Sequence, residues 1–506
     1  MVKRLAVIGS SGGNLFYLGG NQPLNLLEEI DQQCKRNDCQ LMAVQYIGAE
    51  ESLDRNRPGT RAALYTLKNG KIIVGSHAYL ENINKEAKKS DGVIAETIRN
   101  GQIDGLIMVS ADPLGVNSCA VKAAIEKTIP IVGTGGTSMA WVESIGGHVV
   151  GSSGTTGTTN RTRALTLVSY LCSYWKITSR PAHIQWNKLN LTGILTAGLP
   201  AFIALAMVYT VAERFPAQET AQLLQLAIAC IPALLAVLSA KQISDLNEVT
   251  LIAALLAGFF ANNSGVLGGI ASGLAAGALS QYLLDVCTRW KVPITTSNLI
   301  AGALSGLIPG VLINLVLAPF LLFIQNGLVR FIEVMVSWNG LLIGALSGLL
   351  IWMSLLKKGY HALILPIILI EIAQTGTSFF GAIDMICLVA TAAGVNAAIS
   401  VLNRSERAAA KKGLVMNVCY GTFVESVYPY FTNKAIFIST LVSACVSGML
   451  AGWLNLRGVA YVPFVVAPLL SHSFVVFLLV MVTAMALSFI LVLIVLQVDK
   501  STHIND

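Results

Sequence analysis

The stretch Gly421-Thr-Phe-Val-Glu-Ser-Val-Tyr-Pro-Tyr-Phe431 places a carboxylate, that of Glu425, in a region made of successive apolar runs. A charged side chain at the centre of a bilayer costs about 3 kcal/mol or more, so a carboxylate retained there indicates a cavity or a polar partner. Gly421 and Pro429 also interrupt a regular helix, and non-helical backbone at membrane depth needs surrounding protein or a cavity. This stretch therefore predicts a polar site inside a helical membrane domain.

The surrounding region, residues 191–498, reads as a polytopic α-helical membrane domain in the inner membrane of the cell. It contains about ten apolar runs, several near the length of about 20 residues with which a helix crosses a bilayer. A large buried soluble core is the alternative, but repeated uncharged stretches of this length are rare outside membranes. We expect the domain to end at residue 498 and a polar tail to occupy residues 499–506.

Residues 1–176 differ from the rest of the chain, because they carry most of its charge. Five short apolar stretches end in Gly or Ser clusters, and helical patterns fall between them; the stretches are residues 4–8, 41–46, 105–109, 130–132 and 148–150. This alternation predicts an α/β domain with a doubly wound parallel sheet. Residues 177–190, with Pro181 and Trp186, form a linker that we expect to end at the headgroup layer.

The N-terminal domain is expected in the cytoplasm. The first strand is too short for the apolar core of a signal peptide, and the nine cysteines form no CxxC pair, which is typical of a reducing compartment. Basic connections such as the one around Arg407, Lys411 and Lys412 are expected on the same side. The net charge of +7 suits such loops, and we expect no nucleic-acid partner.

The Gly-rich turns of the N-terminal domain are candidate ligand sites. Ligands of such sheets bind beyond the carboxyl ends of the strands, where backbone N–H groups can approach an anion. The alternative is ordinary turn chemistry, since neither GxGxxG nor a P-loop is present, and the cofactor is unknown; no metal site is expected. The counter-charge for a phosphate or carboxylate would be Arg161 or Arg163. The candidate ligand residues are Gly9, Ser10, Ser11, Gly12, Gly133, Thr134, Gly135, Gly136, Thr137, Ser138, Thr155, Thr156 and Arg161.

In the membrane domain, two carboxylate-bearing segments stop being regular helices. Glu371 is followed by Thr375-Gly-Thr377, and Glu425 by Pro429. Two such breaks predict two re-entrant hairpins that meet at a substrate, although Glu371 or Asp384 could also be an interfacial loop residue. Glycines at positions 265, 269, 273 and 277 predict a close helix-packing seam, either within the chain or between subunits.

The sequence from about residue 299 to 470 resembles the membrane IIC component of the bacterial sugar phosphotransferase system, in the glucose–fructose–lactose superfamily and its uncharacterised IIC-like branch. The resemblance lies in Tyr360-His361-Ala-Leu-Ile-Leu-Pro366, the Gly-bearing loop after Glu371, and the Glu425 stretch. It implies a homodimer, elevator-like movement, and sugar binding by His361 and Glu425. The full candidate substrate site consists of Glu425, His361, Glu371, Gln374, Thr375 and Asp384.

Two departures from that family argue against phosphorylation-coupled transport. Ser426 stands where the family has Gly, and Gly9-Ser10-Ser11 follows the first strand, with no cysteine nucleophile. Three functions remain open. The first is a transporter or facilitator for a small polar solute, a sugar or polyol, regulated by the cytoplasmic domain. The second is a membrane-anchored sensor or effector gated by a nucleotide or sugar phosphate, and the third is an enzyme of the soluble domain with a membrane anchor.

Overall fold

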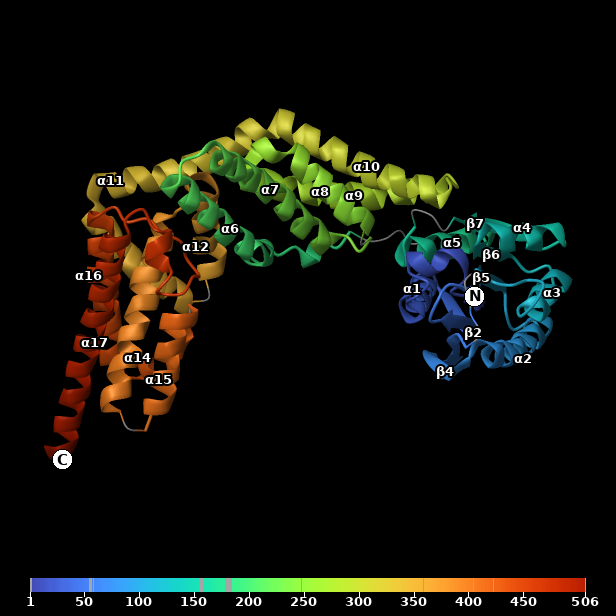
Figure 1. Cartoon of the computed structure of the whole chain (residues 1–506), viewed down its shortest axis with the longest axis horizontal. Coiled ribbons are helices and arrows are strands. Elements are labelled where there is room, and N and C mark those ends of the chain that lie inside the picture. Colours follow the sequence, from blue (N-terminus) through green and yellow to red (C-terminus); the bar gives the residue numbers. More distant parts are fainter. Residues whose placement is uncertain are drawn as a thin grey trace. The chain divides into compact units, whose positions relative to one another are not determined.

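The structure, a computed structural model, describes residues 2–53, 57, 59–154, 158–177, 184–246, 248–357, 359–403, 405–421 and 423–505, with backbone only from residue 499. It begins with an α/β region and continues as helices (Figure 1). Thr155 and Thr156 of the candidate ligand site lie outside the described residues.

The N-terminal sheet has seven strands in the order β4-β3-β2-β1-β5-β6-β7. Five neighbouring strands, β2, β1, β5, β6 and β7, pair in parallel. At the β2 edge, β3 pairs with β2 and β4 pairs with β3, both in antiparallel orientation. The strands are β1 (Lys3–Ser10), β2 (Cys39–Ala49), β3 (Arg61–Lys68), β4 (Lys71–Tyr79), β5 (Gly105–Val109), β6 (Ile131–Thr134) and β7 (Val149–Ser153). The sheet is therefore mostly parallel, and the prediction of a purely parallel sheet was wrong at this edge.

Asn69 and Gly70 explain the antiparallel edge. Both have positive φ, 50° and 72°, and they join β3 directly to β4. An Asn-Gly pair adopts such a turn readily, and a two-residue turn makes the next strand antiparallel.

Helices cover both faces of the sheet: α1 (Pro23–Arg36), α2 (Leu80–Arg99), α3 (Ser118–Glu126), α4 (Gly136–Ser144) and α5 (Asn160–Tyr174). Alternate strand residues face opposite sides, as a strand requires. Leu5 and Val7 pack with residues of α1 and α5, whereas Ala6 and Ile8 pack with residues of α2 and α3. The core therefore forms two layers, one on each side of β1.

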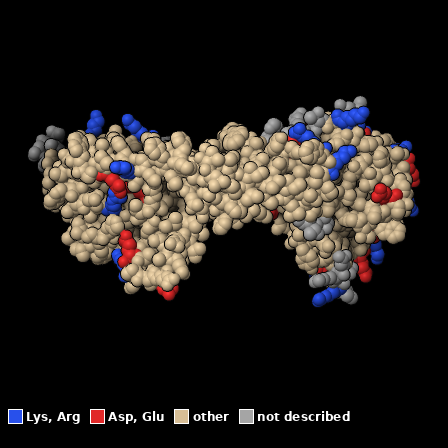
Figure 2. Space-filling model, turned by 90° about the horizontal axis from the view of Figure 1, so that it is seen from above, with Lys and Arg blue, Asp and Glu red and all other residues tan. Residues whose placement is uncertain are grey.

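The rest of the chain is helical: α6 (Leu191–Arg214), α7 (Gln218–Ile243), α8 (Glu248–Phe260), α9 (Gly265–Arg289), α10 (Ile294–Leu312), α11 (Ala318–Leu356), α12 (Tyr360–Thr375), α13 (Phe379–Ile383), α14 (Thr391–Leu402), α15 (Arg407–Val415), α16 (Lys434–Trp453) and α17 (Phe474–Asn505). Among the described residues, seven helices are long and apolar enough to cross a membrane. One of them joins α10 and α11 through a π-helical turn, Ile313–Leu317. Figure 2 shows one face of the molecule, and a long stretch of the surface on this face carries no charged side chain.

Glycines allow two pairs of these helices to touch through their backbones. Gly269 and Gly273 of α9 face Pro232 and Ala236 of α7, so this part of the predicted seam packs within the chain. A second seam, which the sequence reading missed, joins α11 to α16. A Cβ atom on Gly344 would overlap the Gly448 oxygen, and one on Gly448 would overlap the Gly344 oxygen; Gly340 and Gly452 repeat this relation.

The chain divides into two compact units. The N-terminal unit comprises Met1–Asn187, Ala240–Ala254 and Ala275–Leu307, and the C-terminal unit comprises Lys188–Ser239, Leu255–Leu274 and Ile308–Asp506. The N-terminal unit thus includes the ends of several apolar helices together with the α/β domain. The predicted domain boundary at residue 176 stays a prediction.

Candidate functional site

The first candidate site, in the C-terminal unit, begins where α12 stops. Gly376 has a φ of +75°, and a side chain there would collide with Tyr209, so the chain turns sharply after Thr375. Ser378 then starts α13 by accepting a hydrogen bond from the Gly381 N–H at 3.1 Å. Its backbone exchanges two hydrogen bonds with Gly458, of 2.8 and 3.0 Å. Two non-helical segments, the turn after α12 and the loop after α16, are therefore joined at one point.

A charge cluster lies at this junction. The Glu371 side chain is fully buried, and its Oε2 accepts a 2.5 Å hydrogen bond from the Ser378 hydroxyl. Arg457 approaches Glu371 Oε1 at 3.7 Å and Glu333 Oε1 at 3.6 Å. Both separations exceed hydrogen-bond length, and Glu371 Oε1 has no hydrogen-bond partner among the described residues. Arg457 is therefore attracted to both glutamates by charge, while Glu371 Oε1 can still accept a hydrogen bond.

A cavity of about 810 Å³ adjoins the cluster. It combines charged and amide groups with two tryptophans and is lined by Glu333, Val336, Ser337, Trp338, Asn339, Gly340, Leu341, Thr375, Gly452, Trp453, Asn455, Arg457 and His472. Asn339 has non-helical φ/ψ inside α11, and Asn455 has a φ of +49°. Three interruptions of helical backbone, at Asn339, at Gly376 and after α16, therefore surround or adjoin the cavity.

A second polar cluster joins the start of α12 to residues that follow α13 and α16. Asp384 is buried, and its Oδ1 accepts a 2.7 Å hydrogen bond from the Tyr360 hydroxyl. The Tyr461 hydroxyl lies 3.2 Å from His361 Nε2, and the rings of Tyr360, His361 and Tyr461 pack against one another. Asp384 also begins a π-helical segment, Asp384–Ala390. Such segments are frequent at functional sites.

The structure distributes the predicted membrane-site residues over these clusters. Glu371 and Thr375 belong to the Arg457 cavity, and His361 and Asp384 belong to the second cluster. The Gln374 side chain donates to Asn326 Oδ1 at 3.1 Å, outside the cavity lining.

Glu425 lies elsewhere, at the exposed start of a 3₁₀ helix, Val424–Thr432. It interacts electrostatically with Tyr461 and Tyr428, but it does not line the cavity. The structure therefore does not bring Glu425 together with the Arg457 cavity, and its role in substrate binding stays a prediction.

The second candidate site lies in the N-terminal unit, at the carboxyl ends of β1, β5 and β6. A cavity of about 490 Å³ is lined by Ser10, Gly12, Gly13, Asn14, Leu53, Ser110, Asp112, Gly135, Gly136, Thr137 and Ser138. β1 lies between β2 and β5 in the sheet, which is the switch point where ligands of open α/β sheets bind. The structure thus brings together predicted residues from both sequence regions, Ser10 and Gly12 with Gly135–Ser138.

The remaining predicted residues of this domain lie near the cavity or inside the domain. Gly9 lies against Val109, Ser11 Oγ accepts from the Ala49 N–H at 2.9 Å, and Gly133 and Thr134 are buried. These residues shape the strand ends but do not line the cavity.

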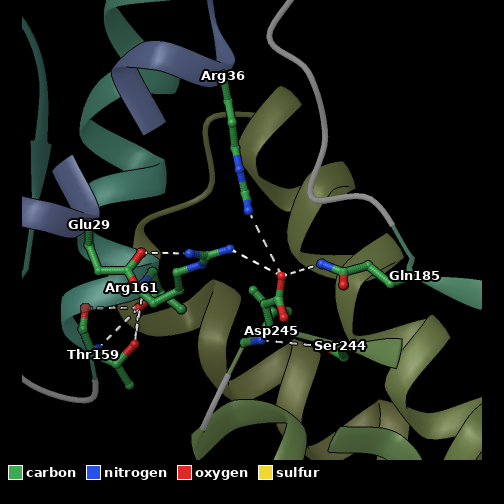
Figure 3. A network of polar contacts seen from close by, with 9 residues as sticks. Glu29, Arg36, Thr159, Arg161, Gln185, Ser244 and Asp245 are labelled. Carbon is green, nitrogen blue, oxygen red and sulfur yellow. Dashed lines mark hydrogen bonds and ion pairs between the residues drawn. The ribbon is translucent and has the colours of Figure 1, made fainter. Parts of the chain in front are cut away.

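Arg161 is not the counter-charge for this cavity. Its Nη1 lies 2.6 Å from Glu29 Oε2, and its Nη2 lies 3.6 Å from Asp245 Oδ2 (Figure 3). Arg36 and Gln185 also reach the Asp245 carboxylate, at 3.9 and 2.6 Å. Carboxylates already surround the guanidinium, so the prediction that Arg161 balances an anion at the Gly-rich turns is not supported.

The neighbouring Arg163 has an internal role. It is fully buried and donates to Asn160, Leu18 and Thr158. Burial lowers the pKa of its guanidinium to about 10. Arg163 therefore fixes the loops around the start of α5.

The sequence reading missed Arg457 and Tyr461. Both lie in the connection between the apolar runs that form α16 and α17. An arginine between two helices that are long and apolar enough to cross a membrane is itself a signal, because charges at membrane depth are rare and are usually paired. Among the described residues, no group of three or more His, Cys, Asp or Glu side chains is placed to hold a metal ion.

No protein-family model matches the chain, and none of the curated proteins compared with it matches significantly.

Proposed function

We propose that the chain is a membrane transporter or facilitator for a small polar solute, a sugar or polyol, and that its N-terminal α/β domain regulates it. The observation that carries the proposal is the polar cavity beside Arg457, in a region whose helices are long and apolar enough to cross a membrane. An arginine facing two glutamates in such a region is costly to retain and is typical of a substrate pathway.

The cavity has the composition expected of a small-molecule site. Trp338 and Trp453 offer flat apolar surface, while Asn339, Asn455 and Arg457 offer groups that hydrogen-bond hydroxyls. Ligand cavities measure about 300–1,000 Å³ and combine aromatic surface with a few polar groups. The volume of about 810 Å³ lies in this range.

The regulatory part of the proposal rests on the N-terminal cavity. Its hydroxyl groups and glycine backbone suit a small polar or anionic ligand from the cytoplasm. The homodimer and the two re-entrant hairpins rest on the resemblance to the IIC component and on the helix breaks. No residue for phosphorylation coupling was found in the sequence, so we propose transport without it.

The sensor function is the second candidate, because one observation favours it. The Arg161 network joins α1 and α5 of the α/β domain to Asp245, which lies between α7 and α8 in the same compact unit. A ligand-dependent change in the α/β domain could reach these helix ends through that network.

The test is uptake of radiolabelled hexoses and hexitols by proteoliposomes containing the full chain. We expect the double variant Glu371→Gln with Arg457→Gln to lower uptake of the transported solute about tenfold to hundredfold, as loss of charge-assisted hydrogen bonds does. The double variant avoids leaving one charge buried alone. Arg330→Gln, an exposed arginine on α11 outside the cavity lining, is the matched control. Unchanged uptake in the double variant, or no uptake of any of these solutes by the unaltered protein, would contradict the proposal.

A further inference from the structure

Asp384 is a buried carboxylate whose bonding is incomplete. Its exposed fraction is 3%, and its Oδ2 has no hydrogen-bond partner among the described residues. It accepts a hydrogen bond from the Tyr360 hydroxyl and interacts with the Tyr461 backbone, and it forms no ion pair in the part of the chain that the structure describes. An isolated ionised carboxylate away from water is strongly unfavourable, and uptake of a proton removes that cost.

A chain of groups that can pass protons leads away from Asp384. The Tyr360 hydroxyl donates to Asp384 and interacts with the Tyr461 hydroxyl, which lies 3.2 Å from His361 Nε2. Each hydroxyl can accept one proton while it releases another, and imidazole can do the same through its two nitrogens. His361 is partly exposed, so the chain runs from the surface of the C-terminal unit to its interior.

The titratable groups near Asp384 are few. They are Tyr360 of α12, Tyr461 of the loop after α16, and Cys387 of the π-helical segment itself. Cys445 of α16 lies beside Cys387, and Glu425 acts on Tyr461 from a greater distance. His361, which packs against Tyr360 and Tyr461, is a further titratable group here, and it carries a positive charge only after it binds a proton. A proton is therefore the positive charge that we expect this arrangement to receive.

Asp384 and Tyr461 lie on the two chain segments that also carry the groups of the Arg457 cavity. Ser378 binds Glu371 and pairs with Gly458, and Asp384 follows after the five residues of α13. On the other segment, Tyr461 lies four positions after Arg457. A change in charge at Asp384 therefore acts on two segments that also carry the cavity groups.

Tyr461 is held in an unfavourable conformation. Its φ is +61°, in the left-handed region that a bulky residue seldom adopts. Such a conformation costs about 1–3 kcal/mol and persists where surrounding contacts impose it, as at functional sites. In this conformation, the Tyr461 hydroxyl interacts with both Tyr360 and His361.

We propose that Asp384 binds a transported proton, delivered through His361, Tyr461 and Tyr360, and that its protonation is coupled to solute binding in the Arg457 cavity. In the step, a hydronium ion at the surface gives one proton to one nitrogen of His361 and becomes water, and the other nitrogen releases its proton to Tyr461. Each hydroxyl accepts one proton and releases another, so its O–H bond is broken and remade. The net change is that hydronium and the Asp384 carboxylate become water and a carboxylic acid. The coupling, but not proton binding itself, rests on the proposed transport function.

The first experiment measures proton binding without any solute. Infrared difference spectra of the full chain in nanodiscs, recorded across pH, should show the C=O band of a protonated carboxylic acid. Other buried carboxylates, such as Glu371 and Asp91, can contribute to this band, so the component that belongs to Asp384 is the difference between variants. That component should be lost in Asp384→Asn, be shifted in Asp384→Glu, and be retained in Glu219→Gln, an exposed carboxylate at the start of α7. A band with the same intensity in Asp384→Asn as in the unaltered protein, or no such band in the unaltered protein, would overturn the proton site.

The second experiment measures coupling in proteoliposomes loaded with the hexose or hexitol that shows uptake. One coupled proton allows up to about tenfold accumulation for a pH gradient of one unit. Asp384→Asn should lose this accumulation, and Tyr461→Phe should slow it without changing its final level. The coupling would be overturned if Asp384→Asn still accumulated the solute. It would also be overturned if uptake by the unaltered protein did not change with the pH gradient. If the unaltered protein takes up none of these solutes, the coupling fails with the proposed function, and the infrared result alone decides the proton site.

Discussion

Arg161 in the N-terminal unit and Arg457 in the C-terminal unit each face two carboxylates, and both side chains are almost buried, with exposed fractions of 5% and 11%. Their contacts differ. Arg161 makes a 2.6 Å contact with Glu29, whereas both ion pairs of Arg457 are longer than 3.5 Å. Both arginines line a cavity, of about 500 Å³ at Arg161 and about 810 Å³ at Arg457, so the difference lies in how closely the carboxylates hold each guanidinium. The same residue type is therefore held by a close ion pair in one unit, and only by longer ion pairs in the other.

The largest effect should follow from removing Arg161. Arg161→Gln should lower the free energy of unfolding of the N-terminal unit by about 3 kcal/mol, the lower end for a broken buried ion pair, because its carboxylates are partly solvated. Hydrogen exchange of the β1 and β5 amides in the full chain measures this loss.

Arg99→Gln is the matched control, since the Arg99–Glu126 ion pair lies at the surface, and it should leave exchange unchanged. Equal protection in Arg161→Gln and the unaltered chain would show that the network in Figure 3 does not hold the fold together.

A smaller effect is expected at the Arg457 cluster. The double variant Glu371→Gln with Arg457→Gln should change the free energy of unfolding by less than about 1 kcal/mol, because a buried ion pair can be replaced by neutral groups at little cost. Arg457→Gln alone should cost more, since it leaves the fully buried Glu371 without a counter-charge. Thermal unfolding in detergent, followed by tryptophan fluorescence, compares the two. A double variant less stable than Arg457→Gln would make the cluster structural, like the Arg161 network.

The smallest effect concerns Asp91, a buried carboxylate that faces backbone N–H groups instead of an arginine. Its Oδ2 accepts from Cys119 and Ala120 at 2.8 and 3.1 Å, at the start of α3. Burial raises the pKa of Asp91, although these N–H groups oppose the shift.

Because the folded state then binds the proton more tightly, the contribution of Asp91 to stability grows as pH falls from the raised pKa towards the ordinary value of about 3.9. The stability difference between the unaltered protein and Asp91→Asn should therefore move in favour of the unaltered protein on acidification. Denaturant titrations at several pH values measure this difference, and a difference that is constant with pH would mean that Asp91 keeps its ordinary pKa.

Much of the fold could be predicted from the sequence, because hydrophobic periodicity and turn residues are local signals. The five parallel strands and the apolar helices follow from such patterns. The β3–β4 hairpin carried an equally local signal, Asn69-Gly70, which was overlooked.

The candidate sites were only partly predictable, since they depend on contacts between distant residues. Glu371 was identified as a buried carboxylate, but its distance in sequence from Arg457 hid the ion pair. Arg161 follows a Gly-rich turn, and nothing near it in sequence indicates that Asp245 neutralises it. The residues next to a charged side chain in the sequence show that the charge lies in an unusual environment. The residue with which it forms an ion pair depends on the tertiary fold.

The glycine seam between α11 and α16 limits how the cavity can change shape. Gly340, Gly344, Gly448 and Gly452 bring the two backbones into contact, with Cα–H groups facing carbonyl oxygens as weak hydrogen bonds. A slide of one helix along the other would push backbone atoms of one into those of the other. We therefore expect α11 and α16 to move together at this seam. The hinges of the cavity are then its interrupted backbones, Asn339 within α11 and the turn at Asn455 after α16.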